Sequence, residues 1–168
     1  MPYTIGDDGL LDFSECSDDV EKDQQAWDYF CENLSDAEVV AWDGKLVRGF
    51  TEKTFDHIVS GSTNRWDAAR GHDIPFVEKR ARCIPLIGKV IRGEIQSRCW
   101  RILMHRGKKS NPRKILTVIE IEREYFVVVL NEVKDRYAIV TAYPSDEQYY
   151  KQRIQNQGTN LGLWGGRK

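Results

Sequence analysis

The chain has 168 residues, of which 40% are hydrophobic and 30% are charged. This length suffices for one domain with an adequate core, or for a domain with an appended segment. The sequence has no run of about 18 apolar residues, which excludes a transmembrane helix. Residues 1–8 lack the basic and apolar regions of a signal peptide. We therefore expect a cytoplasmic protein with no membrane partner.

The four cysteines form no C-x-x-C motif and have no histidine pair nearby; they are Cys16, Cys31, Cys83 and Cys99. This spacing does not fit a zinc site. Without a secretion signal we expect reduced thiols rather than disulfides. The sequence therefore predicts no metal and no cofactor.

Acidic and basic residues are segregated along the chain, although the formal net charge is only −1. Residues 1–60 carry a net charge of −11, and residues 61–168 carry +10. The 37 residues from Glu78 to Lys114 contain twelve Lys or Arg and only two acidic residues. Such a cationic surface suits a phosphate backbone. The acidic part is either a solvated segment or a competitor for that surface.

In chain order, the first predicted element is an amphipathic helix over 18–34. Acidic residues crowd its first turn after Ser17, where the helix dipole favours them. Apolar residues then recur at helical spacing. Trp27 and Phe30 are expected to be core anchors of this helix.

A β-hairpin is predicted next, because the apolar runs 38–42 and 45–48 flank Asp43-Gly44. The sequence leaves open whether this hairpin extends the main sheet or stands beside it. Thr51 can then cap a short helix that turns Phe55 and Ile58 inward and leaves His57 near the edge.

The remainder predicts a sheet preceded by a basic helix over 76–91, which Pro85 bends or restarts. Strand-like runs cover 98–106, 114–122, 125–133 and 137–143. A last helix over 146–157 and a flexible tail over 158–168 follow.

We therefore predict an α+β fold. N-terminal helices and a hairpin precede a four-stranded antiparallel β-meander, with a helix packed on one face and a C-terminal helix. The expected divisions are an acidic N-terminal segment over 1–48, a main domain over 49–157 and the tail over 158–168.

Four short motifs resemble, in their order, the barnase/EndoU/colicin/RelE (BECR-fold) ribonucleases. They are Phe55–Ile58, Glu78–Pro85, Cys99–Arg101 and a strand ending in Thr141–Tyr143 before a closing helix. The resemblance covers about residues 50–155. It is greatest to the members associated with phages and polymorphic toxins.

The resemblance implies a metal-independent endoribonuclease toxin that cleaves tRNA or another structured RNA. It also implies an acidic immunity or antitoxin protein as a partner. Cleavage without a metal needs a general base for the 2′-hydroxyl, a general acid for the leaving 5′-oxygen, and cations for the phosphate charge. Of the three histidines, His57 matches the motif and can do either proton transfer.

Two alternatives for proton transfer stay open. His57 can instead be a histidine at a helix end, bonded to a backbone carbonyl. Glu120 or Glu122, on a middle strand, can act as the base, as in the barnase branch.

Arginines and hydroxyls complete the predicted site. Arg80 and Arg101 are expected to clamp the scissile phosphate, because a guanidinium binds phosphate through two hydrogen bonds. Arg82 lies about 200° around a helix from Arg80, so both face one phosphate only if the helix ends between them. The resemblance implies hydroxyls from Thr141 and Tyr143. The residues predicted to bind substrate are Arg82, Arg106, Lys108, Lys109, Arg113, Lys114 and Trp66.

Two other functions fit the same residues. One is a non-catalytic RNA-binding module built on the same sheet. The other is a protein-interaction role in which the acidic and basic halves of neighbouring copies dock.

Overall fold

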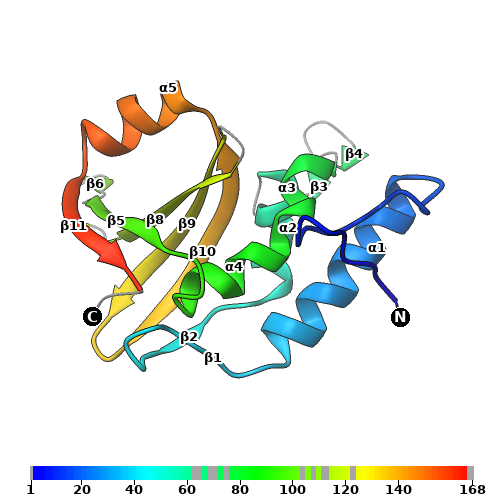
Figure 1. The fold of residues 1–168 in the computed structure, drawn as a ribbon, viewed down its shortest axis with the longest axis horizontal. Coiled ribbons are helices and arrows are strands. Elements are labelled where there is room, and N and C mark those ends of the chain that lie inside the picture. The colour runs from blue at the N-terminus through cyan, green and yellow to red at the C-terminus, as the bar shows by residue number, and fades with distance from the viewer. Residues whose placement is uncertain are drawn as a thin grey trace.

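The computed structural model describes residues 2–61, 66–67, 72–73, 76–102, 105–106, 109–110, 114–121 and 124–165. Only the backbone is described at 66–67, 72–73, 105–106, 109–110, 114–116, 120–121 and 124. Within these ranges the chain builds a seven-stranded sheet in the order β1-β2-β10-β9-β8-β5-β11. Helices α1 to α4 lie together on one side of this sheet, and α5 lies on the other (Figure 1).

The N-terminal helix α1 (Asp19–Phe30) begins one residue later than predicted. The Asp18 side chain caps it by accepting a hydrogen bond from the Glu21 N–H, and Glu21 in turn binds Ser17. The helix continues as one wider turn, η1 (Cys31–Ser35). Phe30 is fully buried, which confirms it as a core anchor.

The predicted hairpin is present as β1 (Val39–Val40) and β2 (Leu46–Arg48), which pair antiparallel. Strand β2 also pairs in parallel with β10 (Arg136–Ser145), with Val47 opposite Tyr137. The hairpin therefore extends the main sheet. The Tyr137 hydroxyl donates a 2.6 Å hydrogen bond to Asp43 in the hairpin turn, which fixes that turn to the sheet.

The next three helices pack against one another beside β10. Helix α2 (Glu52–Ser60) starts at the predicted Thr51 cap and ends at Gly61, whose φ of +81° needs glycine. The basic segment divides at Cys83 into α3 (Glu78–Arg82) and α4 (Ile84–Ile91), with Pro85 in the first turn of α4. This division is the bend predicted from the proline.

The four predicted strands form the middle of the sheet. They are β5 (Ser97–Ile102), β8 (Lys114–Ile121), β9 (Glu124–Val133) and β10, and each pairs antiparallel with the next. The α+β class is confirmed, but a four-stranded antiparallel sheet is not the whole sheet. The structure adds β1, β2 and β11 (Thr159–Trp164), and the β2–β10 pair makes the sheet mixed.

Strand β10 continues through Pro144, where the sequence analysis ended it. Proline is tolerated there because β2 covers the outer side of β10 only at Tyr137 and Ala138. The rest of that side is a sheet edge with respect to strand pairing, the setting in which proline occurs within strands. Two short strand pairs complete the described structure: β3 (Trp66–Asp67) with β4 (His72–Asp73), and β6 (His105–Arg106) with β7 (Lys109–Ser110).

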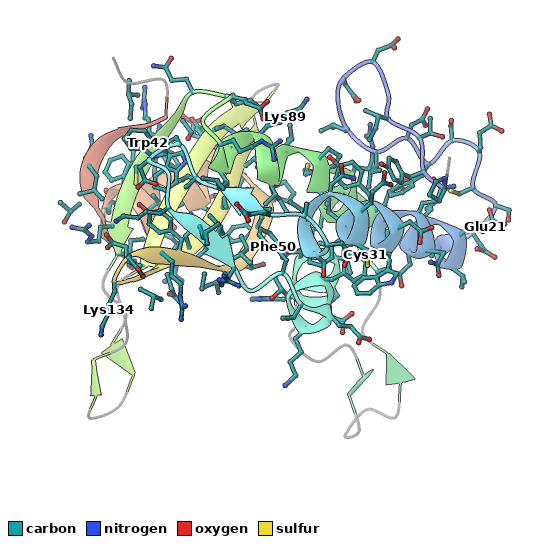
Figure 2. The ribbon with its side chains drawn as sticks, turned by 90° about the horizontal axis from the view of Figure 1, so that it is seen from below. Glu21, Cys31, Trp42, Phe50, Lys89 and Lys134 are labelled. Carbon is teal, nitrogen blue, oxygen red and sulfur yellow. The ribbon has the colours of Figure 1, made fainter. Side chains whose placement is uncertain are left out.

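The two faces of the sheet carry separate hydrophobic cores. The larger core joins α1 to α4 to the face that includes Cys99, Val128 and Leu130. Phe50 lies where this helical layer meets the sheet, with its ring 6.0 Å from that of Phe30 (Figure 2). The smaller core lies under α5 (Glu147–Tyr149) and the wider turns of η2 (Tyr150–Gln155). Trp100 is buried there.

The acidic N-terminal segment shares the larger core with the rest of the chain. Leu11 is fully buried and Phe13 nearly so, and the Phe13 ring packs edge-on against that of Phe76. The backbone N–H of Leu11 donates to the carbonyl of Arg82. Residues 1–48 are thus attached by packing, with no break in the core at the predicted boundary.

The structure corrects the prediction of a flexible tail. Residues 159–164 form β11, which pairs with β5 and ends at the buried Trp164. The Trp164 indole donates to the carbonyls of Val90 and Ile91, and its ring packs edge-on against those of Trp42 and Tyr137. The glycines in this stretch suggested mobility, but one aromatic side chain anchors the strand.

The four cysteines are free thiols. No helix in the described ranges is long and apolar enough to cross a membrane. Over the same ranges, no three side chains of His, Cys, Asp or Glu gather in a way that could hold a metal ion.

Replacing Trp164 with alanine is expected to lower the free energy of unfolding by about 3–5 kcal/mol, because it empties a buried site and frees two carbonyls. Chemical denaturation measures this loss. Thr159→Ala, at an exposed position of the same strand, is the control and should change stability by less than about 0.5 kcal/mol. Equal stability of Trp164→Ala and the wild type would show that β11 does not hold the sheet.

Candidate functional site

A hollow of about 790 Å³ lies at the edge of the sheet, between α2, α3, the end of β10 and the start of α5. We call it the His57 pocket. Four of the five predicted catalytic residues line it, from three separate elements: His57, Arg80, Thr141 and Tyr143. The other lining residues are Gly61, Val77, Lys79, Pro144, Ser145, Asp146 and Tyr149.

His57 lies in the last turn of α2 and is half-buried. Phe55, Ile58 and Val59 turn into the core from the same helix, which leaves the imidazole at the edge that faces the pocket. The His57 side chain therefore lines the same pocket as Arg80 and is partly exposed to solvent. That is the placement a proton-transfer group needs.

Arg80 ties α3 to the end of α2. Its Nε donates to the Ile58 carbonyl at 2.8 Å, and an Nη2 hydrogen donates to the His57 carbonyl at 3.1 Å. These carbonyls belong to the last turn of α2, where the helix dipole favours a cation. Burial lowers the pKa of Arg80, but a guanidinium stays charged at neutral pH.

The unused part of the Arg80 guanidinium faces the pocket. Its central carbon lies 5.5 Å from the centre of the Tyr143 ring, a cation–π contact. Nη1 lies beside Gly61, about 3.8 Å from where a Cβ would stand. Among the described residues, Nη1 has no carboxylate partner. Its two hydrogens can therefore bind an anion in the pocket.

The phenols of Tyr143 and Tyr149 form a pair, with their oxygens 3.2 Å apart. Burial, followed by this hydrogen bond, raises the pKa of Tyr143 well above its usual value, and the opposing effect of Arg80 is smaller. Tyr143 is therefore a neutral phenol at neutral pH. It can donate a proton or a hydrogen bond but is a poor base.

Thr141 is only 6% exposed, yet its hydroxyl makes no hydrogen bond to any described residue. A bulge in β10 between Ile139 and Thr141 shifts the register. Thr141 and Tyr143 then share one face, opposite Val129 and Val127 of the smaller core. An unsatisfied buried hydroxyl costs about 1–3 kcal/mol, and its position on the pocket wall suits a polar ligand.

Arg101 does not join this pocket, so the predicted Arg80–Arg101 clamp is not formed. Its guanidinium binds Glu132 through two hydrogen bonds of 2.9 and 3.1 Å. Arg101 lies across β8 from Leu130, on the face of the larger core, whereas Thr141 faces the smaller core. A carboxylate two strands away holds the arginine at the other end of the sheet.

Arg82 lines a different hollow, of about 850 Å³, between residues 8–16, α3 and the start of β9. We call it the leader hollow. Its guanidinium donates to the Leu11 carbonyl at 3.1 Å and to the Asp8 carboxylate at 3.0 Å. Arg80 and Arg82 thus face separate spaces, as their helical spacing predicts. Lys79 and Pro144 line both hollows, so the two adjoin.

Several predicted residues cannot be placed in the site. Lys108, Arg113 and Glu122 lie outside the described residues, and no side chain is described for Trp66, Arg106, Lys109, Lys114 or Glu120. Conversely, Lys79, Asp146 and Tyr149 line the pocket without having been predicted. Lys79 adjoins Arg80 in the basic motif, and Asp146 is the cap of α5. Neither feature distinguishes a pocket residue from a surface residue.

The pocket therefore combines an imidazole, a guanidinium with hydrogens to spare, an unpaired hydroxyl and a neutral phenol. Lys79 adds a second cation, and Asp146 adds a carboxylate that already accepts the Tyr149 N–H at 2.7 Å. This set can bind an anion such as phosphate and move a proton beside it.

Comparison with protein-family models, with curated proteins and with solved structures finds no match to this chain.

Arg80→Met is expected to lower the free energy of unfolding by about 2 kcal/mol or more, because it keeps the stem but removes both hydrogen bonds to α2. Arg80→Lys should lose less, since an ammonium still carries charge to the helix end. Thermal or chemical denaturation gives both values. Arg136→Met, at an exposed position of β10, is the matched control, and an Arg80→Met variant as stable as this control would contradict the capping role.

Proposed function

We propose that the chain is a metal-independent endoribonuclease of the barnase/EndoU/colicin/RelE type. It acts as a toxin in the cytoplasm on tRNA or another structured RNA. The observation that carries the proposal is the gathering of His57, Arg80, Thr141 and Tyr143 around one pocket. These four residues belong to three motifs that are far apart in the sequence.

In the proposed reaction His57 takes the proton of the ribose 2′-hydroxyl. The 2′-oxygen then forms a bond to phosphorus, and the bond from phosphorus to the 5′-oxygen breaks. The leaving oxygen takes the proton of the Tyr143 phenol, and Tyr149 connects that phenol to solvent. The products are a 2′,3′-cyclic phosphate and a 5′-hydroxyl, so no metal or cofactor is consumed.

Charge on the phosphate is stabilised by Arg80 and Thr141. Nη1 of Arg80 pairs with no carboxylate among the described residues, and the Thr141 hydroxyl has no hydrogen-bond partner among them. Donors already in place need no rearrangement when charge develops on the phosphoryl oxygens. Such a site also suits an acidic immunity or antitoxin protein, which would inhibit by covering these cations.

Incubation of the purified protein with total RNA in EDTA is expected to give fragments ending in cyclic phosphate. His57→Ala should lower the rate at least about 100-fold, the usual effect of removing a general acid–base group. His72→Ala, a histidine with no proposed role, serves as the control.

If His57→Ala cleaved RNA at the wild-type rate, His57 would have no part in the mechanism. RNA that is bound but stays intact would instead favour the non-catalytic RNA-binding module.

Thr141→Val separates a ligand-binding role from a structural one. It should leave stability unchanged or raise it by as much as about 1–3 kcal/mol, because the buried hydroxyl has no partner. RNA cleavage should fall about 10-fold or more through loss of a donor to the phosphate. Denaturation curves and initial rates measure the two effects.

Thr117→Val is the matched control for this substitution. Thr117 is also buried, but its hydroxyl donates to the Val128 carbonyl at 3.3 Å. We expect this variant to lose stability and keep activity. Full activity in Thr141→Val would rule out the proposed contact with phosphate.

A further inference from the structure

A third hollow, of about 430 Å³, shares Tyr125 with the leader hollow. We call it the tyrosine hollow. It is lined by Gln96, Ser97, Arg98, Val118, Ile119, Tyr125, Tyr150 and Leu163. Tyr125 lines both hollows, and the leader hollow adjoins the His57 pocket through Lys79 and Pro144. The three hollows thus adjoin one another near the start of β9 and the end of β10.

Tyr125 stands directly beside the His57 pocket. Its register partner on β10 is Ser145, which lines that pocket. Opposed residues on paired strands have Cα atoms about 4.5–5.5 Å apart. A nucleotide next to one held in the His57 pocket is therefore within reach of the Tyr125 ring.

The Tyr125 ring is held by an aromatic stack. It stacks on Tyr150 with centroids 4.5 Å apart and an interplanar angle of 13°, and Trp100 packs edge-on against Tyr150 behind it. Tyr150 and Trp100 are buried, whereas Tyr125 is half-buried. A ring fixed in this way can stack a nucleobase, because its side chain loses little further conformational entropy when the base binds.

The tyrosine hollow also carries polar groups, of which Arg98 is open to a ligand. Arg98 is exposed and has no ion pair among the described residues. The Ser97 hydroxyl is buried, with the residue only 3% exposed, and it makes no hydrogen bond to them. By contrast, Arg82 in the leader hollow is paired with Asp8. Arg98 is thus the better cation for a second phosphate.

From this arrangement we infer that the substrate is single-stranded RNA at the point of cleavage. One base next to the scissile phosphate stacks on Tyr125, and a further phosphate pairs with Arg98. An unpaired base is required, because a base inside an A-form duplex has no free face to offer to a side chain. The inference rests on the proposed ribonuclease function. It specifies that the cut falls in a loop or a single-stranded segment of the target.

The test uses a short mixed-sequence 2′-O-methyl RNA labelled with fluorescein, which cannot be cut because its 2′-oxygens are blocked. Fluorescence anisotropy should show about 5- to 150-fold weaker binding to Tyr125→Leu, since a base stacked on an aromatic ring contributes about 1–3 kcal/mol. Tyr125→Phe should bind like the wild type, because it keeps the ring. Annealing the probe to its complement should weaken binding to the wild type.

Arg98→Gln provides a second measurement at an exposed position that tolerates substitution. It should weaken binding and reduce the slope of log affinity against log salt by about 0.7, the value for one phosphate contact on a single strand. Arg136→Gln is the matched control and should leave the slope unchanged.

Equal binding by wild type, Tyr125→Leu and Arg98→Gln, or equal binding of duplex and single strand, would overturn this inference even if the wild type cuts RNA. Absence of both RNA binding and cleavage in the wild type would instead overturn the proposed function itself.

Discussion

The candidate site depends on one interaction, the binding of the Arg80 guanidinium to the last carbonyls of α2. Arg80 joins α3 to the turn that carries His57, through hydrogen bonds to Ile58 and to His57 itself. The same guanidinium lies against Tyr143 of β10. One charged group thus connects α2, α3 and β10, the three elements that carry the predicted residues of the pocket. The hydrogens left on it are those with which the proposed mechanism binds phosphate.

Much of the fold could be predicted from local patterns. The Thr51 cap, the Asp43-Gly44 turn and the break near Pro85 are encoded by residues close together in the chain, and each is present. For the hairpin the sequence left open whether it joins the main sheet, and β11 was not predicted, because both additions depend on distant contacts. The parallel pairing of β2 with β10 and the anchoring of β11 by Trp164 have no local pattern. Glycines around the tryptophan favoured a mobile tail, and burial of one indole outweighed them.

The site was predictable in part for the same reason. His57, Arg80, Thr141 and Tyr143 belong to short motifs, and periodicity indicated that Arg80 and Arg82 face different ways. Arg101 was misplaced because nothing in its own strand indicates that Glu132, two strands away, would bind its guanidinium. The bulge in β10, which fixes the face presented by Thr141, likewise depends on pairing with β9. Composition does not reveal which charged groups neutralise one another.

Strand β2, which joins β1 to β10, also bears on how the chain reaches this structure. Its contacts with β10 join residues far apart in sequence; Asp43 and Tyr137 are 94 positions apart. The β8–β9 and β9–β10 hairpins, by contrast, close over a few residues. Because closing a long loop costs more entropy than closing a short one, the hairpins are favoured to assemble first. Docking of β1 and β2 then becomes a late step that completes an already formed β10, so the nascent sheet passes through a stage with its β10 edge open.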